Sequence, residues 1–498
     1  MRCPWGPRTD TADIVTSRRA PGAAISRLGM PTAGSLARFG LLLLVLLSGP
    51  VGCSTVPMNE PLAEFAPAGL GPISTGGYRR IALDPNGASD ELLVFLAFSG
   101  GGKRSSAFAY GALKGLRDFE IELDGRKRRL LDEVDSISAV SGGSFPAAYY
   151  GLHRDRIFTD FEADFLKRDV EAYIWGIYLL PWNWEWWLNP FYGTNDEMAQ
   201  IYDDLMFHGA TYRDLIRNGL PFISVNATDI SYGTTFSFGQ DQFDLICSDL
   251  SSFPISRAVA ASNGFPVLFT PITLKSHSDR CAGREPGWVT AAAGFPPETR
   301  EYHLARLARQ YLDPERTRYV HLMDGGIADN LAMRQLINGV IAYATRGDEV
   351  VATGQQATRR VLVISVDGQG SADTSWPQSR TVTSLGQIFE AVSGTQIDSY
   401  NFETLTLMQE KLQDLKVALS KIRCEFAPVI AGHACDDVEV YFLHLSLDAI
   451  EDEATRTSLG GIPTGLTIPD EAVDQLVAAG QSLVAASPVL EALRRDLD

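Results

Sequence analysis

From about residue 90 onward, the apolar positions of the chain alternate between two periods. "LLVFLAF" (Leu92 to Phe98) is an uninterrupted apolar run, which is typical of a strand that is buried on both faces. The stretch Ser105 to Phe119 that follows keeps its large apolar side chains at helical spacing. Because such strands and helices alternate to about residue 450 without an internal repeat, the pattern predicts one α/β domain with a mostly parallel sheet.

The same reading places the other elements of this domain. Further strands are predicted at Ser136 to Val140, Phe222 to Asn226, Tyr319 to Met323, Val361 to Val366 and Val438 to Leu445. Further helices are predicted at Ser256 to Ser262, Asn330 to Ala344 and Phe402 to Lys421. Ligands of parallel sheets bind beyond the carboxyl ends of the strands, so the loops after these strands are where chemistry is expected.

The pattern divides the chain into four parts. We expect an export signal region over residues 1–53, a flexible tether over 54–90, a catalytic domain over 91–450 and a C-terminal helical extension, packed on the domain, over 451–498. The tether is predicted from its many Pro, Gly and small residues.

The composition is globular and acidic. Of 498 residues, 45% are hydrophobic, and 43 Lys and Arg face 61 Asp and Glu, which gives a formal charge of −18. The length allows a large core. The negative charge disfavours nucleic-acid binding and also disfavours attachment to anionic lipids through a basic face.

A short apolar run near the start suggests another form of membrane attachment. Phe39 to Val51 follows Arg38 and ends at Gly52-Cys53. The run is too short to span a bilayer comfortably, and its basic flank is typical of an export signal. It resembles a bacterial lipoprotein signal. That resemblance implies a lipid on Cys53 and a place in the cell envelope, on the outer membrane facing the periplasm, with translation starting at Met30. A signal-anchor helix is the alternative.

Four cysteines remain besides Cys3 and Cys53. They are Cys247, Cys281, Cys424 and Cys435. Export permits disulfides, and Cys247–Cys281 with Cys424–Cys435 is the more local of the three possible pairings, among which the sequence does not choose. A zinc site is the weaker alternative, because no C-x-x-C pair or histidine cluster accompanies them. We expect no metal and no organic cofactor.

The first strand runs into "SGGGKRS", where Gly100, Gly101 and Gly102 precede two cations. The spacing fits neither a phosphate-binding loop nor a dinucleotide fingerprint. Consecutive peptide N–H groups can instead stabilise the oxyanion of an acyl-transfer intermediate. Arg104 would favour a nearby anion, such as the phosphate of a lipid headgroup. The alternative for Lys103 and Arg104 is two solvated charges at a helix start.

The nucleophile that such a site needs is predicted at Ser141, in "SAVSGGS". A strand turns there into a helix through small residues, as in a G-x-S-x-G nucleophile elbow, with Gly143 at the last position and Ala139 in place of the first glycine. Ser138 and Ser144 lack small residues at both offsets, so hydrogen bonding in the turn suits them better.

None of the seven histidines lies in a recognisable base motif. Asp324, in "LMDGGIADN", follows an apolar strand and opens onto two glycines. A carboxylate that is hydrogen-bonded to the serine in a dry cleft can itself act as the base. The alternative is a capping role for Asp324 before the next helix, although Asp329 and Asn330 suit that role better.

Together, "SGGGKRS", "AVSGG" and "DGGIADN" resemble the patatin-like phospholipase family. Two further stretches, "NATDISYGTTFSF" and "SRAVAASNGFPVLFTPITL", resemble its bacterial exported branch. The resemblance implies a three-layer α/β/α fold, Ser141 as nucleophile, Asp324 as general base, an oxyanion hole at residues 100–102 with Arg104 as the basic residue beside it, and no cofactor.

Tyr173 to Gly193 holds five of the eight tryptophans. Tryptophan is enriched at membrane interfaces, so the segment, including Trp184, Trp186 and Trp187, is predicted to form a lid or acyl-chain wall. An ordinary aromatic core cluster is the alternative.

The predicted function is a serine lipid acyl hydrolase that acts on phospholipid or lysophospholipid. Two alternatives stay open: an acyltransferase or thioesterase with the same dyad, and a non-catalytic lipoprotein that binds lipid or proteins. The sequence assigns no protein partner.

Overall fold

The structure is a computed structural model that describes residues 58–67, 71–123, 125–178, 192–266, 268–345, 355–370 and 385–497. The chain divides into two units, residues 1–57 and 58–498, and the account below concerns the second. The predicted signal and Cys53 lie outside the described residues.

The described strands and helices follow the chain in this order. The strands are β1 (Glu60–Pro61), β2 (Leu92–Phe98), β3 (Glu120–Leu123), β4 (Arg126–Arg129), β5 (Val134–Val140), β6 (Phe222–Asp229), β7 (Thr234–Ser237), β8 (Ser248–Asp249), β9 (Ile272–Lys275), β10 (Tyr319–Met323), β11 (Arg360–Asp367), β12 (Val429–Ile430), β13 (His433–Ala434) and β14 (Glu439–Ser446). The helices are α2 (Gly102–Asp118), α3 (Ser144–His153), α4 (Ile157–Phe161), α5 (Val170–Tyr178), α7 (Thr194–Tyr202), α8 (Tyr212–Asn218), α9 (Gln240–Asp244), α10 (Ile255–Ser262), α11 (Gly287–Ala292), α12 (Arg300–Leu312), α13 (Gly326–Asp329), α14 (Arg334–Thr345), α16 (Leu385–Phe426), α17 (Glu453–Gly460), α18 (Asp470–Ala485) and α19 (Pro488–Leu497).

The central sheet is mixed, with mostly parallel strands. Its order is β14-β11-β2-β5-β6-β10-β9, and β7 pairs with β6. The five strands from β14 to β6 are parallel, whereas β7, β9 and β10 pair antiparallel. All six predicted strands are present within a few residues of their expected bounds. The inner strands β2 and β11 are buried almost throughout, whereas the edge strand β14 is mostly half-buried.

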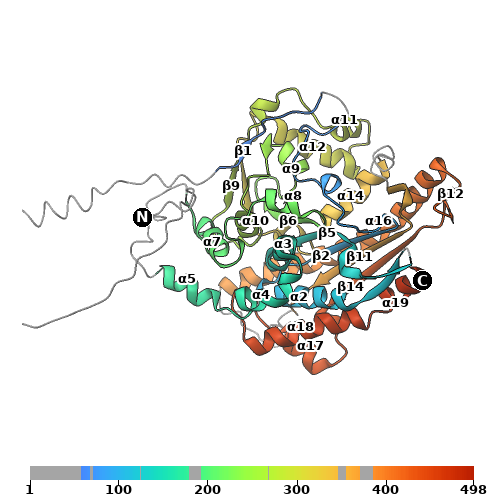
Figure 1. The fold of residues 1–498 in the computed structure, drawn as a ribbon. Helices are drawn as coiled ribbons and strands as arrows, with labels where there is room; N and C mark the ends of the chain where they lie inside the picture. The colour runs from blue at the N-terminus through green and yellow to red at the C-terminus, as the bar shows by residue number, and fades with distance from the viewer. Residues whose placement is uncertain are drawn as a thin grey trace, which may run out of the picture. The chain divides into compact units, whose positions relative to one another are not determined.

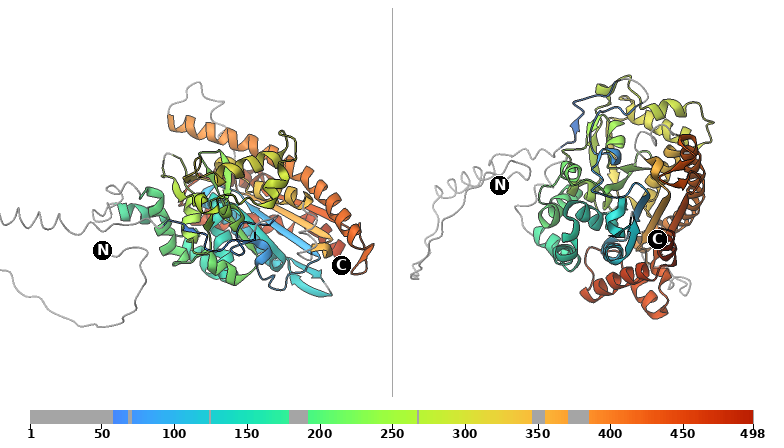
Figure 2. Two further views of the ribbon diagram at one scale, coloured as in Figure 1. Left: turned by 90° about the horizontal axis from the view of Figure 1, so that it is seen from above. Right: turned by 45° about the vertical axis from the view of Figure 1, so that its right-hand side comes forward.

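Helices cover both faces of this sheet and give a three-layer α/β/α fold (Figures 1 and 2). Successive residues of β2 show this directly. Leu92, Val94 and Leu96 belong to a core shared with α2, α3 and α18, whereas Leu93 and Ala97 belong to a second core shared with α16. Because neighbouring residues of a strand point to opposite faces, β2 must be apolar throughout.

The region predicted as a tether is packed on the domain in its described residues. Strand β1 pairs with β8. Tyr78 is buried, and its hydroxyl oxygen accepts a hydrogen bond from the Ile223 N–H at 2.6 Å. Leu62 and Ile73 contact Cys247 and Cys281 in a small separate core. The prediction of a flexible tether over 54–90 is therefore wrong for residues 58–67 and 71–90, because a few buried apolar side chains anchor a segment of linker-like composition.

Cysteines are joined in the more local arrangement. The structure has Cys247–Cys281 and Cys424–Cys435 disulfides, the second at the end of the long helix α16. Helix α16 begins well before the predicted Phe402, and α14 begins at Arg334 rather than at Asn330.

The C-terminal extension contains three helices, of which α18 packs closely against α2. A Cβ on Gly111 of α2 would overlap the Val477 carbonyl, and a Cβ on Gly480 of α18 would overlap the Phe108 carbonyl. Glycine at both positions lets the two backbones approach. Within the described residues, no single helix is long and apolar enough to cross a membrane, and the bent pair α18–α19 meets the test only by length and composition.

Candidate active site

Ser141 lies on a tight turn between β5 and α3. Its φ is 47°, which is the left-handed region that a side chain other than glycine rarely adopts. A Cβ at Gly142 would overlap the carbonyl oxygen of Gly102, and one at Gly143 would lie 2.7 Å from the Phe98 Cβ. The small residues of the elbow are therefore required by close approach of the β2 and β5 turns.

The serine hydroxyl faces a carboxylate that is 183 positions away in the sequence. Ser141 Oγ donates to Asp324 Oδ2 at 3.0 Å, and it lies 3.5 Å from Asn263 Oδ1. The Ser141 N–H donates to Ser262 Oγ at 2.8 Å, which ties the turn to the end of α10. The structure thus brings together the two residues that the sequence proposes as nucleophile and base.

Asp324 reaches this position because β10 is short and antiparallel. Strand β10 pairs with β6 through Leu322 opposite Asp229 and Met323 opposite Thr228, so it stops near the carboxyl end of β6. The Thr228 hydroxyl then donates to the Asp324 carbonyl at 2.8 Å. Although β10 is antiparallel to β6, it therefore places Asp324 close to the carboxyl end of β5, where Ser141 lies.

The Asp324 carboxyl group is buried, and burial raises its pKa to about 6. Hydrogen bonds from the Gly326 N–H, at 2.8 Å, and from the Ser141 hydroxyl oppose this shift because they stabilise the ionised form. A carboxylate with this pKa is ionised at neutral pH and is a stronger base than a solvated aspartate.

The glycine loop offers fewer donors than the sequence suggests. The Gly100 N–H donates to the Asn330 carbonyl at 3.0 Å, and the Lys103 N–H donates to the Gly465 carbonyl at 2.9 Å. Within the described part of the chain, the N–H groups of Gly101 and Gly102 have no acceptor. Both glycines have positive φ, 135° and 60°, and Gly102 lies against the elbow that carries Ser141. These two N–H groups are the candidate oxyanion donors.

Arg104 does not offer its guanidinium to a ligand. Its Nε donates to the Gly368 carbonyl at 2.8 Å, its Nη1 donates to the Ile462 carbonyl, and its Nη2 lies 3.5 Å from Thr464 Oγ1. The expectation that Arg104 favours an anion such as a headgroup phosphate is wrong in this structure, because two distant segments, at Gly368 and at Ile462–Thr464, accept hydrogen bonds from its guanidinium group. Arg104 instead fixes the start of α2, beside Gly101, to the loop after β11 and to the C-terminal extension.

Lys103 is also buried, and is not a solvated charge. Its Nζ donates to the Arg168 carbonyl at 2.6 Å and lies 5.1 Å from the centre of the Phe165 ring. Burial lowers its pKa to about 8, although Asp169 and Glu171 oppose the shift. Both cations after the glycines therefore hold the loop in place.

Two asparagines lie beside the dyad. Asn263 was not singled out from the sequence, and Asn330 was predicted only as a helix cap. Asn263 Nδ2 donates to the Val259 carbonyl at 2.8 Å and to Ser144 Oγ at 3.0 Å, which turns its Oδ1 toward Ser141. A Cβ at Gly100 would lie 2.5 Å from Asn330 Oδ1, so this carboxamide is packed against the glycine loop. Neither has a local signature, because their neighbours come from other strands.

The helix-capping role falls to Asp329 and not to Asn330. Asp329 accepts hydrogen bonds from the N–H groups of Met333, at 3.2 Å, and Arg334, at 2.7 Å, at the start of α14. Asn330 Nδ2 instead donates to Gln369 Oε1 at 3.2 Å.

The remaining predicted site residues are placed as follows. Ala139 is buried in β5 opposite Phe98 and Val225, so its methyl group is accommodated where the usual motif has glycine. Trp175, on α5, is 65% exposed, whereas Trp184, Trp186 and Trp187 lie outside the described residues.

Among the described residues, no group of His, Cys, Asp and Glu side chains could hold a metal ion.

Comparison with protein families shows a similarity over nearly half of the chain. Residues 96–337 match the family model described as patatin-like phospholipase. Residues 96–337 of this chain are therefore similar to a patatin-like phospholipase domain. The match runs from the end of β2 through the elbow and β10 to the first part of α14, and so includes Ser141 and Asp324.

Two other comparisons concern curated proteins and solved structures. A search of curated proteins gave no match. Among solved structures, human GIVD cytosolic phospholipase A2 aligns with 82% of this chain at 12% identity and a TM-score of 0.38. The chain spans 63% of the length of that protein chain.

Proposed function

We propose that this protein is a serine lipid acyl hydrolase in which Ser141 and Asp324 form a catalytic dyad. The observation that carries the proposal is the 3.0 Å contact between Ser141 Oγ and Asp324 Oδ2 beside two N–H groups that have no acceptor among the described residues. Among the hydrogen bonds of the described residues, none joins a histidine to Ser141. The carboxylate is therefore the base that this geometry supplies.

The first half of the reaction forms an acyl-enzyme. Ser141 Oγ attacks the ester carbonyl carbon while its proton moves to Asp324 Oδ2. The carbonyl oxygen becomes negative, and the N–H groups of Gly101 and Gly102 stabilise it. The carbon–oxygen bond to the glycerol moiety then breaks, and the leaving alkoxide takes the proton from Asp324.

The second half releases the acyl group. Asp324, again ionised, takes a proton from a water molecule that attacks the acyl carbon. The same two N–H groups stabilise the second tetrahedral intermediate, and its collapse returns the proton to Ser141 and yields a fatty acid. A raised pKa suits this role, since one carboxyl group must accept and give back a proton twice in each turnover.

We also propose that the substrate is phospholipid or lysophospholipid met at a membrane surface of the cell envelope. Three features support this. The apolar run ending at Cys53 is typical of a lipoprotein signal, and the two disulfides suit an oxidising compartment. Trp175, on α5 within the tryptophan-rich segment, is exposed.

The test is product analysis by mass spectrometry with purified protein and vesicles that contain phosphatidylcholine and lysophosphatidylcholine. In ¹⁸O-water, hydrolysis through an acyl-enzyme places one labelled oxygen in the released fatty acid. We expect this label with the wild type and with the exposed-site control Ser231→Ala, and no product with Ser141→Ala. Product formation by Ser141→Ala at the wild-type rate would contradict the proposal.

A further inference from the structure

The side chain of Asn263, the residue that follows α10, faces the catalytic serine. Its Oδ1 lies 3.5 Å from Ser141 Oγ, whereas Asp324 Oδ2 lies 3.0 Å from the same oxygen. The serine hydroxyl group has one proton, and the nearer acceptor, the carboxylate, takes it. Ser141 Oγ therefore has two acceptor oxygens beside it and one proton to offer them.

The hydrogen bonds of the Asn263 carboxamide fix which of its atoms faces Ser141. Its Nδ2 donates to the Val259 carbonyl at 2.8 Å and to Ser144 Oγ at 3.0 Å. A carbonyl oxygen can only accept, and the Ser144 hydroxyl already gives its proton to the Ser141 carbonyl at 2.5 Å. Both neighbours therefore need a donor from Asn263, so its acceptor oxygen must point to the catalytic serine.

Asp324 and Asn263 each direct one acceptor oxygen to the place where the reaction occurs. Asp324 Oδ1 accepts the Gly326 N–H at 2.8 Å, which leaves Oδ2 for Ser141. Among the hydrogen bonds of the described residues, Asn263 Oδ1 has no donor other than the serine. Two acceptors that face one point in a largely buried site favour a group with two protons.

We propose that Asn263 holds the water molecule that hydrolyses the acyl-enzyme, and that it thereby favours hydrolysis over transfer of the acyl group to an alcohol. The inference rests on the proposed function, because it concerns an acyl group on Ser141. Once Ser141 Oγ carries this group it has no proton, and both acceptors lose their donor. A water molecule can donate one proton to Asp324 Oδ2 and the other to Asn263 Oδ1.

The number of protons distinguishes water from an alcohol in this step. The water oxygen forms a bond to the acyl carbon while one proton moves to Asp324, and the bond from that carbon to Ser141 Oγ then breaks as Asp324 returns the proton to the serine. The second proton stays on the oxygen that enters the fatty acid, hydrogen-bonded to Asn263. An alcohol gives its only proton to Asp324, so it leaves Asn263 Oδ1 without a donor.

The experiment measures how the acyl-enzyme partitions between water and methanol. The full chain is mixed with p-nitrophenyl butyrate and methanol, and methyl butyrate and butyrate are quantified. We expect Asn263→Ala to raise the ratio of methyl butyrate to butyrate about tenfold, because the transition state for hydrolysis loses a neutral hydrogen bond that methanol does not make. The ratio does not depend on how much of the variant is folded, since only acyl-enzyme contributes to it.

A second measurement separates the water from the serine. With enzyme in excess over the ester, the release of nitrophenol reports formation of the acyl-enzyme alone. Asn263→Ala should keep this rate within about threefold of the wild type, because Asp324 is the nearer acceptor of the serine proton. Asn263→Leu is similar in size to the wild-type residue and lacks the acceptor, and it should give the same result if the alanine variant does not fold.

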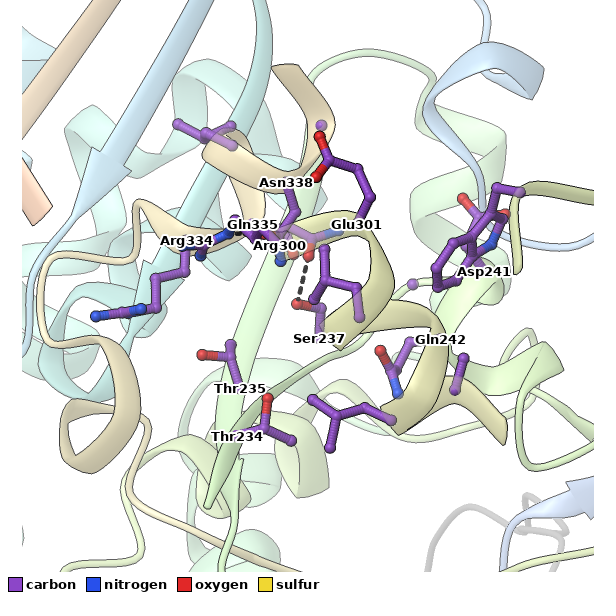
Figure 3. Close-up of a pocket in the computed structure, with 18 of the residues that line it drawn as sticks. Thr234, Thr235, Ser237, Asp241, Gln242, Arg300, Glu301, Arg334, Gln335 and Asn338 are labelled. Carbon is purple, nitrogen blue, oxygen red and sulfur yellow. Dashed lines mark hydrogen bonds between the residues drawn. The ribbon is translucent and has the colours of Figure 1, made fainter. Parts of the chain in front are cut away.

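Asn338→Ala is the matched control. Asn338 lines a cavity beside Arg300 (Figure 3) and accepts a hydrogen bond from Arg300 Nε at 3.1 Å. The lining of this cavity contains none of Ser141, Asp324 and Asn263. Loss of this asparagine should therefore leave both the product ratio and the rate of nitrophenol release unchanged.

Two results would overturn the proposal and leave the dyad in place. One is a wild-type product ratio in both Asn263 variants. The other is a nitrophenol release that falls tenfold or more, which would mean that Asn263 orients the serine and not the water. Failure of the proposed function would look different, because Ser141→Ala would then release nitrophenol and form methyl butyrate as fast as the wild type.

Discussion

The catalytic centre and the arginines at the starts of α12 and α14, Arg300 and Arg334, lie in one domain, but they differ in how their charged groups are stabilised. Asp324 accepts hydrogen bonds from Ser141 and Gly326, and the cations next to the glycine loop are bonded to distant carbonyl groups. Arg300 and Arg334 are half-exposed, so water reaches both guanidinium groups. The difference indicates that protein groups preorganise the buried centre, whereas solvent stabilises the cations at the half-exposed positions.

The largest effect is expected from removal of the dyad. Ser141→Ala and Asp324→Asn should each lower kcat for a soluble short-chain ester by about 10³-fold or more, and the double variant should lose little beyond either single one, because the two side chains act as a unit. Steady-state kinetics on the four proteins measures this. Effects that multiply in the double variant would mean that the two residues act independently. Asp436→Asn, at an exposed position, is the control.

The pH dependence of catalysis sharpens the same point. Because burial raises the pKa of Asp324 to about 6, kcat/KM should fall about tenfold for each pH unit below 6 and level off above 7. The measurement is a pH–rate profile with a neutral ester substrate. A profile that stays flat down to pH 4.5 would be inconsistent with Asp324 as the base.

Replacing Arg104 tests whether the glycine loop needs its link to the C-terminal extension to stay in place. Arg104→Gln should lower the free energy of unfolding by about 2–4 kcal/mol, because carbonyl groups of Gly368 and Ile462 lose a buried charged donor. It should also lower kcat more than it raises KM. Denaturant unfolding and kinetics check both, with Arg117→Gln on the same helix as control. Unchanged kcat in folded Arg104→Gln would show that the glycine loop does not need this support.

Ionisation of Asp324 should also have a cost in stability. Its pKa is raised in the folded protein, so the neutral carboxyl group favours folding at acid pH and this contribution is lost as the pH rises through about 6. Asp324→Asn stays neutral. Its free energy of unfolding relative to the wild type should therefore rise by up to about 3 kcal/mol between pH 4 and pH 8. Urea unfolding at both pH values measures this, and a difference that does not change with pH would argue against a raised pKa.

The smallest effect is expected at the exposed Trp175. Trp175→Ala should lower turnover of micellar phospholipid a few-fold, because an interfacial aromatic side chain is lost, and leave turnover of a soluble ester unchanged. Parallel assays on the two substrates check this. An equal loss on both would mean that Trp175 supports the fold or the site and not the interface.

The sequence predicts best what depends on short stretches of chain. The strand before Ser141 and the strand before Asp324 are apolar runs that end in small residues, and these local patterns are enough to place both side chains at strand ends. The pairing of Ser141 with Asp324 then follows from the sheet.

Contacts between distant segments could not be predicted in this way. Nothing near Arg104 in the sequence indicates that it binds Gly368 and Ile462, and its position after three glycines favoured an anion-binding role instead. Tyr78 is a second case, since it is buried within a segment whose composition is that of a linker. In both cases one long side chain finds its partners only after the domain has folded.

The most direct test of the dyad is labelling by a fluorophosphonate probe, which reacts with an activated serine. We expect the wild type to be labelled on Ser141, as identified by peptide mass spectrometry, with a labelling rate that falls as the pH drops below about 6 and that is lost in Asp324→Asn. Labelling of another serine, or a rate on Ser141 that is the same in wild type and Asp324→Asn, would contradict the assignment of these two residues as nucleophile and base.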